Sequence, residues 1–469
     1  MSTVETATMS DGPKTSHSPS FGLRAGALSP LETLAQSIST IAPSTSPPAT
    51  IPLVFALAGE GTALAYLIAM GLMVLVGICI AQFARESASP GSLYVYTRGS
   101  LPPIFSAITA WALFFAYITT AAAVIGGFLL FAGPFLKLLP SSMHVPPVTL
   151  VIFAAGVSLW VAYRDVKISA RLMLYIEAVS VALIAIVIAI TILRHGFHLD
   201  LTQFSPRLLR GASGRGIGLG VMLAIFSFVG FESATTLGAE AREPLRTIPR
   251  AVIQSALLAG IFFVVCSYGE TLGFHDSPVP LNQSEAPFFY LATAAQVSFL
   301  ARIIDAGVLI SAFAATLACV IAASRVLLLM AHHGLAHSRF GVTHARNETP
   351  GLASILTAVL AFLPVAVIAH RGASGADIYG WMGTLAVFGF LTTYTMAAIA
   401  LAVHLRRERR LTLAKGLLAA AATLAMVAAL LGSIFPVPPA PYRYFPYIYG
   451  VYLVLAMGWY GLSRQRDRA

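Results

Sequence analysis

Long apolar runs with few charged side chains make up most of the chain, and short polar stretches separate them. A helix needs about 20 mainly apolar residues to cross the hydrocarbon core of a bilayer, and each run is near that length. A shorter apolar stretch at 286–299 is too short for a crossing of its own, and we expect an external helical loop there. The pattern predicts twelve membrane-spanning helices, at residues 31–57, 61–84, 104–136, 147–163, 171–193, 216–240, 250–273, 301–330, 351–369, 378–403, 413–435 and 444–463.

Two of these twelve segments contain residues that interrupt a helix. The first segment reads IAPSTSPPATIP from Ile41 to Pro52 and contains four prolines. Each proline removes an amide donor and clashes with the preceding turn, so we expect a break around residues 42–48. The sixth segment has Gly230 followed closely by Glu232, and a carboxylate inside a membrane segment usually marks function.

The two interrupted segments lie five apart, which is where two inverted copies of five helices would place equivalent elements. Interrupted helices at matching positions of two halves indicate the binding site of a transporter. The free amides of a broken helix attract an anion, and its free carbonyls attract a cation. The alternatives are a simple proline kink in the first segment and close glycine packing in the sixth.

The composition supports a membrane protein. The chain has 469 residues, of which 57% are hydrophobic and only 10% charged, whereas soluble domains carry about 25% charged residues. This excludes a water-soluble protein. The three cysteines, Cys79, Cys266 and Cys319, lie in apolar runs without metal-site or disulfide spacing, so we expect buried packing residues.

The positive net charge of +10 is explained by topology. If twelve helices cross the membrane, most of the 29 Lys and Arg residues lie on the side of the N-terminus. Cytoplasmic loops carry such an excess, so the sequence predicts a cytoplasmic (plasma) membrane location with both termini in the cytoplasm. No nucleic-acid partner is needed to explain the charge, and none is predicted.

The sixth segment resembles a known family. The block FSFVGFESATTLGAEAREPLRTIPRAV, from Phe226 to Val252, is similar to the most diagnostic block of the amino acid–polyamine–organocation superfamily. PGSLYVYTRG (Pro90–Gly99) and YGWMGTLAVFGFLTTY (Tyr379–Tyr394) resemble further parts of that family in the same order. The resemblance implies an all-α membrane protein with a 5+5 inverted repeat, in which helices 1 and 6 are broken, plus two C-terminal helices.

The resemblance also implies a domain organisation and an activity. Residues 1–27 are polar and rich in Ser, Thr and Pro, so we expect a disordered cytoplasmic tail. Residues 28–403 would form the transport core, and 404–469 the last two helices with the cytoplasmic C-terminus. The implied activity is secondary transport of amino acids or related amines by alternating access.

Candidate substrate-binding residues lie at the two breaks and on their predicted walls. Family members often have a glycine-rich first break, whereas this chain has Ala-Pro-Ser-Thr-Ser there, which puts the usual α-amino-acid pose in doubt. Transport of a polyamine or another organic amine is therefore the alternative. The candidates are Ile41, Ala42, Pro43, Ser44, Thr45, Ser46, Tyr117, Phe226, Ser227, Phe228, Val229, Gly230, Phe231 and Trp381.

Four polar residues are candidates for ion coupling or gating: Glu177, Glu232, Ser311 and Thr316. Glu177 is a candidate proton carrier because burial favours the protonated carboxyl, and the alternative is an ion pair with a cytoplasmic loop residue. Glu232 supports the broken helix or contacts substrate. Ser311 and Thr316 resemble sodium ligands, although membrane hydroxyls more often bond their own backbone. We expect proton coupling or exchange in preference to sodium coupling.

Other charged groups predict neither a metal site nor catalysis. Oppositely charged residues after the sixth segment, from Glu240 to Arg250, form either an ion-pair network or a solvated loop. Four histidines between His332 and His344 have no cysteine or carboxylate at ligand spacing, so no metal or cofactor is predicted. A membrane-embedded enzyme would need a nucleophile or paired carboxylates, and the sequence places none, so we do not expect an enzyme.

Overall fold

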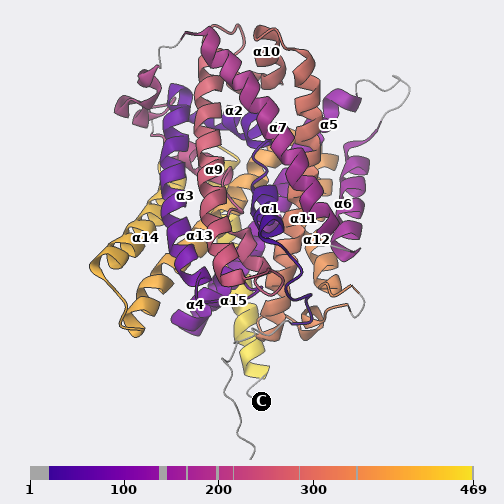
Figure 1. Ribbon diagram of the computed structural model, residues 1–469, viewed down its shortest axis with the longest axis vertical. Helices are drawn as coiled ribbons and strands as arrows, with labels where there is room; N and C mark the ends of the chain where they lie inside the picture. Colours follow the sequence, from indigo (N-terminus) through magenta and orange to yellow (C-terminus); the bar gives the residue numbers. More distant parts are fainter. Residues whose placement is uncertain are drawn as a thin grey trace, which may run out of the picture.

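The computed structural model describes residues 21–136, 145–164, 167–196, 200–214, 216–284, 286–344 and 347–466. All regular elements in these ranges are helices, and the one β contact there is an isolated parallel bridge between Leu28 and Ala241. Most of the long helices run up and down along one axis, so the molecule is a helical bundle (Figure 1). Most of the tail expected at 1–27 lies outside the described residues.

The helices follow the apolar runs of the sequence. The broken first segment forms two helices, and the sixth forms a short helix followed by a 3-10 turn. The α-helices are α1 (Pro30–Ile41), α2 (Ser46–Ala58), α3 (Thr62–Ala84), α4 (Leu93–Ser100), α5 (Pro103–Leu136), α6 (Pro147–Arg164), α7 (Lys167–Arg194), α8 (Gly218–Phe226), α9 (Pro244–Gly273), α10 (Pro287–Ala294), α11 (Phe299–His332), α12 (Gly351–His370), α13 (Gly375–Arg407), α14 (Leu413–Ile434) and α15 (Phe445–Arg466).

The all-helical membrane fold is confirmed, while the number of crossings stays a prediction. Within the described ranges, nine helical stretches are long and apolar enough to cross a membrane, with Ser46–Ala84 counted as one stretch. A shorter apolar helix spans Pro147–Tyr163. The external loop expected at 286–299 contains α10.

Apolar side chains on the outside of the bundle mark its contact with lipid. Helix α14 lies at the periphery (Figure 1), and its Leu424 is 69% exposed. Val454 and Leu455 of α15 are similarly exposed. Large apolar residues exposed side by side are rare on soluble monomers, so this surface is suited to a bilayer.

Glycines permit close packing of α5 against α13 near the centre. A Cβ on Gly389 of α13 would lie 2.6 Å from the backbone oxygen of Ala112, and a Cβ on Gly126 of α5 would lie 2.6 Å from the backbone nitrogen of Tyr379. Small residues let membrane helices approach closely and gain dispersion contacts. The pair α5–α13 therefore forms a rigid support for the aromatic residues that it carries.

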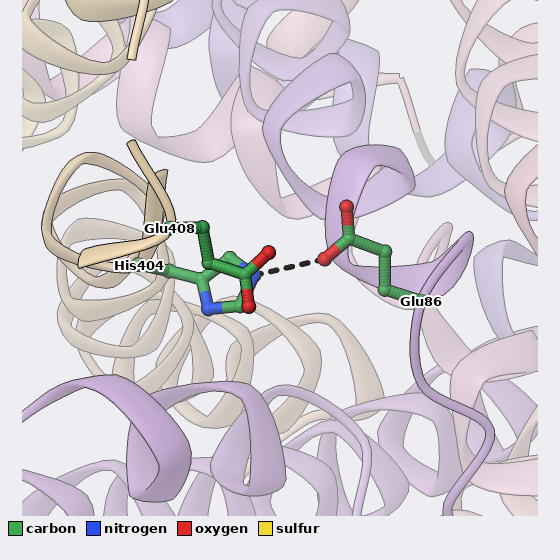
Figure 2. Close-up of side chains that lie close together, drawn as sticks. All are labelled: Glu86, His404 and Glu408. Carbon is green, nitrogen blue, oxygen red and sulfur yellow. Dashed lines mark hydrogen bonds and ion pairs between the residues drawn. The ribbon is translucent and has the colours of Figure 1, made fainter. Parts of the chain in front are cut away.

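At one end of the bundle, Glu86 in the loop after α3 is tied to the end of α13 (Figure 2). Its carboxylate lies 2.8 Å from His404 Nε2 and accepts from Arg410 Nη1 at 2.5 Å. Arg410 also pairs with Glu408 at 3.4 Å. Glu86, His404 and Glu408 are close enough to share an ion, but Arg410 already compensates both carboxylates. The cluster is therefore explained as an ion-pair tether.

We predict that this tether makes stability depend on pH. Burial raises the pKa of Glu86, but hydrogen bonds and charges from His404 and Arg410 outweigh it, so the pKa lies below its usual value. The stabilisation is present above the unfolded pKa of about 4.3 and is lost as pH falls through the folded pKa. Purified Glu86→Gln should melt below wild type at neutral pH, and the two melting temperatures should converge in acid.

The matched control is Asp276→Asn, which removes a carboxyl from an exposed position. It should melt like wild type throughout. A melting difference between Glu86→Gln and wild type that is constant from about pH 3 to 7 would contradict the assigned pKa direction.

Candidate functional site

The first break comprises Ala42–Thr45, between α1 and α2. Ala42 has a left-handed backbone (φ 47°), and its N–H donates to Ile38 O at 3.0 Å, which ends α1. The break is shorter than the expected 42–48, because Pro47 and Pro48 lie in the first turn of α2. Proline is well tolerated in a first turn, where an amide has no helical partner. These two prolines therefore start a helix.

The second break comprises Ser227–Glu232, between α8 and a 3-10 turn at Ser233–Leu237. Gly230 has φ +94°, a conformation that favours glycine. A Cβ at Gly230 would also lie 2.2 Å from Thr40 Cγ2 of α1. Both the backbone angle and the close approach of α1 thus require glycine here.

Hydroxyl groups of α1 supply partners to the open backbone of the second break. Ser37 Oγ donates to Phe231 O at 2.8 Å and accepts from Ala234 N–H at 3.1 Å. Thr40 and Ser233 share a hydrogen bond of 2.9 Å. An unpaired backbone group at membrane depth costs several kcal/mol, so these bonds let the interruption exist. Helix α1, which leads into the first break, is thus bonded to the second break and the turn that follows it.

Ser37 and Thr40 contact the second break or the turn that follows it, and they were missed from the sequence. They lie three residues apart in the stretch QSIST of α1 and so share one helix face. This small polar stripe in an apolar segment was the available signal.

Glu232 is held between two tyrosines. Its carboxylate accepts from Tyr117 of α5 at 2.9 Å and from Tyr394 of α13 at 2.7 Å. All three side chains are fully buried. The phenols occupy one hydrogen-bonding position on each carboxylate oxygen, which fits a residue that supports the broken segment. Tyr394 was not among the predicted site residues, because only the fold brings it to Glu232.

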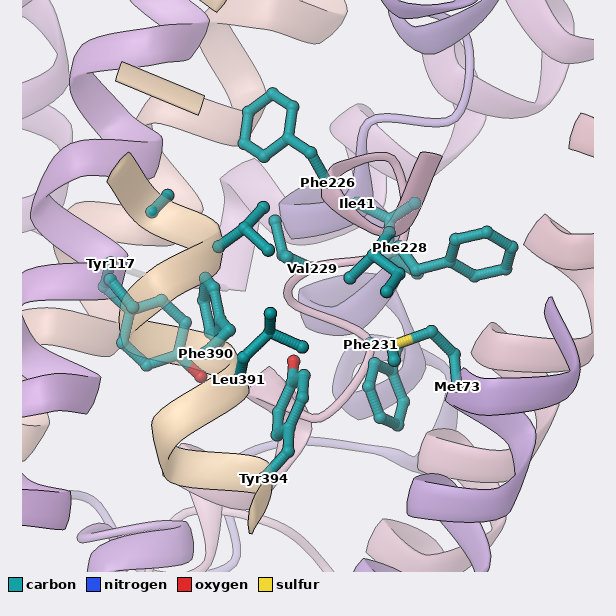
Figure 3. Close-up of a cluster of buried hydrophobic side chains, with 14 of the residues drawn as sticks. Ile41, Met73, Tyr117, Phe226, Phe228, Val229, Phe231, Phe390, Leu391 and Tyr394 are labelled. Atoms are coloured by element: carbon teal, nitrogen blue, oxygen red, sulfur yellow. The ribbon is translucent and has the colours of Figure 1, made fainter. Parts of the chain in front are cut away.

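Aromatic residues of the second break pack into one buried cluster with α5 and α13 (Figure 3). Phe231 lies 5.6 Å from the Tyr394 ring, and Phe226 lies 5.4 Å from Tyr379 in an edge-to-face contact. Val229 is buried in the same cluster. Trp381, predicted as a pocket wall, is partly buried, and no hydrogen bond or ring contact in the described part of the chain places it at either break. Tyr379 is better placed, because it also bonds Thr50 of α2 at 2.8 Å.

The first break contacts a buried carboxylate of α7. Ser44 N–H donates to Glu177 Oε1 at 2.7 Å, and Glu177 is only 3% exposed. Glu177 thus bonds the first break, and no ion pair with a loop residue is found for it within the described ranges. Ser44 Oγ is buried and has no hydrogen-bond partner there. The Ser44 side chain nevertheless interacts with Glu177, so the first break presents both its amide and its hydroxyl to this carboxylate.

The two predicted hydroxyl ligands of α11 differ in placement. Thr45 Oγ1 lies 3.5 Å from Ser311 Oγ, so Ser311 borders the first break. Thr316 donates to Ala312 O of its own helix at 3.0 Å. A hydroxyl committed to its own backbone is the ordinary state in a membrane helix. The structure brings Ser311 to Glu177 and the first break, but it does not bring Thr316 there.

The charged residues after the second break divide into separate contacts. Glu240 forms a two-point ion pair with Arg325 of α11, at 2.6 and 2.8 Å, and both side chains are buried. Arg246 and Glu243 approach only to 3.7 Å and are exposed. In place of the expected network, the described structure contains one buried ion pair, Glu240–Arg325, and one weak surface pair, Glu243–Arg246. Arg325 was not linked to it from the sequence because it lies 85 residues away.

A cavity of about 730 Å³ lies at the other end of α11, lined by Pro48, Pro52, Arg302 and Asp305 among others. Arg302 and Arg325 are 23 residues apart on one helix, which corresponds to roughly 35 Å. The cavity beside α2 is therefore far from the Glu240–Arg325 pair, and two further cavities of about 400 and 530 Å³ lie towards that other end, beside Arg246 and His333 respectively.

A family model described as amino acid permease matches residues 37–460. The chain belongs to the amino acid permease family. The permease is 26% identical over 354 residues to the branched-chain amino acid permease BcaP of Lactococcus lactis, covering 71% of this chain and 74% of that protein. It is also 26% identical over 310 residues to the low-affinity putrescine importer PlaP of Escherichia coli K12, covering 64% and 66%.

A solved structure shares the fold of the permease. A mutant of the manganese transporter of Eremococcus coleocola superposes with a TM-score of 0.59 at 12% identity, covering 93% of this chain and 95% of that one. At this identity the likeness concerns the fold alone. The resemblance read from the second break, and the transporter fold that it implied, are confirmed.

We predict that Ser37 stabilises the second break. Ser37→Ala would leave Phe231 O with one partner fewer and Ala234 N–H unpaired, which costs about 1–3 kcal/mol. The purified variant should melt several degrees below wild type. The matched control is Ser39→Ala on the same helix, whose buried hydroxyl has no partner in the described structure. Equal melting of the two variants would contradict the role of Ser37.

Proposed function

We propose that this permease moves amino acids or related amines across the plasma membrane by alternating access, driven by protons or by exchange. The observation that carries the proposal is the pair of helix breaks, the second of which has backbone groups bonded by the Ser37 hydroxyl of α1. A paired interruption of this kind serves substrate binding in transporters. With the inward excess of Lys and Arg, both termini would lie in the cytoplasm.

In this proposal the substrate lies between the two breaks. The amine would approach the buried hydroxyls of Ser44 and Thr45 at the first break, while Glu177 serves as the proton site. A substrate carboxylate would use the remaining amides of the breaks. The apolar part would contact the aromatic residues of the second break, from Phe226 to Phe231. Residues 28–403 would form this transport core and 404–469 the flanking helices.

A polyamine or another organic amine is the second candidate substrate. Pro43 removes one amide donor from the first break, which weakens a carboxylate site there. The buried carboxylates Glu177 and Glu232 favour a cationic substrate. Relatives carry both kinds of name, a branched-chain amino acid permease and a putrescine importer. The proposed activity is transport without catalysis, and it involves no cofactor and no nucleic acid.

For coupling, we favour the proton over sodium. Glu177 receives a hydrogen bond from the first break itself, so its charge state bears directly on the geometry of Ala42–Thr45. A protonated Glu177 accepts this bond more weakly than the ionised form. Thr316 is committed to its own helix, which leaves Ser311 alone of the two predicted sodium ligands.

We predict that purified permease in liposomes accumulates or exchanges an amine-containing metabolite without ATP. Branched-chain amino acids, other amino acids and polyamines should be tested as a panel, with a proton gradient, without one, and with sodium replaced by choline. Uptake of an amino acid over polyamines supports the first candidate, and the reverse supports the second. The proposed substrate class is wrong if no member of the panel moves or competes.

We predict that Glu177→Gln abolishes accumulation driven by a proton gradient while leaving exchange across the membrane within about threefold of wild type. Glutamine keeps an oxygen that accepts from Ser44 N–H but carries no titratable proton. Glu243→Gln, at an exposed carboxylate, is the control and should accumulate normally. Unchanged accumulation in Glu177→Gln would exclude it as the proton carrier.

A further inference from the structure

Glu270 of α9 is a buried carboxyl without a partner. It is fully buried, and neither of its oxygens has a hydrogen-bond partner in the described part of the chain. The other buried carboxylates of the described chain are satisfied: Glu32 by Ser29 N–H, Glu177 by Ser44 N–H, Glu232 by two tyrosines, and Glu240 by Arg325. Glu270 therefore differs from these carboxylates, because it is buried in an apolar helix without a hydrogen-bond partner in the described structure.

The surroundings of Glu270 supply no positive charge. The titratable groups that interact electrostatically with it in the described structure are Tyr66 of α3 and Cys266 of its own helix, both neutral groups. Helix α7 faces the adjacent Gly269 with Ile188 and Ile192. Of the other helices packed against α9, α2 contains no titratable residue and α10 faces Gly273 with Leu291. Helix α1 contains one carboxylate, Glu32, which accepts from Ser29 N–H at 2.7 Å.

These surroundings decide which ligand Glu270 holds. An ionised carboxylate without a partner is strongly disfavoured in a protein interior, so the group must bind a cation or a proton. A metal ion needs several oxygen ligands, and among the described residues Glu270 belongs to no group of His, Cys, Asp or Glu that could hold one. An ammonium needs space, but the lining residues of the cavity above α2 do not include Glu270. A proton needs neither several oxygen ligands nor free space, so it is the ligand that fits this carboxyl.

Glu270 is connected to the second break through Tyr66. The Tyr66 hydroxyl shares a hydrogen bond of 2.9 Å with Ser227 Oγ, at the first residue of the second break. Phe263, two turns before Glu270 on α9, contacts both the Tyr66 ring at 6.0 Å and the Phe228 ring at 5.3 Å. One face of α9 thus joins the carboxyl to the end of α8.

We propose that Glu270 is a second proton-binding site of the permease, loaded in this conformation and linked through Tyr66 to the second break. On release, the O–H bond of the Glu270 carboxyl breaks, the proton passes to water, and the carboxylate keeps the electron pair. The carboxylate is then the strongest acceptor near the Tyr66 phenol. Tyr66 turns to donate to it and gives up Ser227, which loosens the end of α8.

The physiological role of Glu270 rests on the proposed transport function. Protonation of Glu270 itself can be tested without a substrate. Infrared spectra of the purified protein in nanodiscs of phosphatidylcholine and phosphatidylglycerol would be compared between wild type and Glu270→Gln. We expect wild type at neutral pH to show a C=O stretch of a protonated carboxyl that shifts in D₂O and is missing from the variant. Identical spectra would show that Glu270 is ionised and would overturn the proposal.

The control for this spectrum is Asp276→Asn, which removes an exposed carboxyl and should retain the band. Glu177→Gln should also retain the Glu270 component, which separates the two proton sites. If the band is present but the liposome panel shows no transport, the proton site stands and the proposed function fails.

Two variants test the link to the second break. Tyr66→Phe removes the donor that would stabilise the ionised carboxylate, so the band should persist to higher pH than in wild type. Ser227→Ala frees the Tyr66 hydroxyl to donate to Glu270, so the band should disappear at lower pH. Opposite shifts of about half a pH unit or more support the link. Unchanged titration in both variants, or shifts in the same direction, would overturn it.

Discussion

Every backbone amide and carbonyl at membrane depth needs a partner, and the centre of this permease is arranged around that requirement. Two helices are interrupted, and hydroxyl groups on α1 supply what the second interruption lacks. Gly230 permits the contact because its backbone turns where a side chain would strike Thr40. The opened backbone of the second break is thus stabilised by the helix that leads into the first.

The buried carboxylates Glu232 and Glu240 also have specific partners. The Glu240–Arg325 pair uses both oxygens of the carboxylate, a geometry that only the fork of arginine provides. Such a pair adds little net stability compared with apolar packing, but removal of one partner is costly. It therefore suits a contact that must be complete in one conformation and opened as a unit in another. Glu232 is instead bonded by two phenols, and no salt bridge to it is found among the described residues.

Much of the fold could be predicted from the sequence, because apolar runs and helix-breaking residues act locally. The breaks in the first and sixth segments are examples. Pro47 and Pro48 were interpreted as breakers, although the fold places them at a helix start, where the same chemistry is favourable. The partners of the site, such as Tyr394 and Arg325, could not be predicted, since they lie far away in the chain and only packing brings them together.

Helix α11 connects the two ends of the molecule without an interruption of its own. It has 34 residues, which corresponds to about 50 Å of continuous helix. Asp305 near one end lines the cavity, and Arg325 near the other end forms the buried ion pair with Glu240. Ser311 borders the first break between them. If this continuous helix tilts about its middle, the cavity end and the buried ion pair must move in opposite directions.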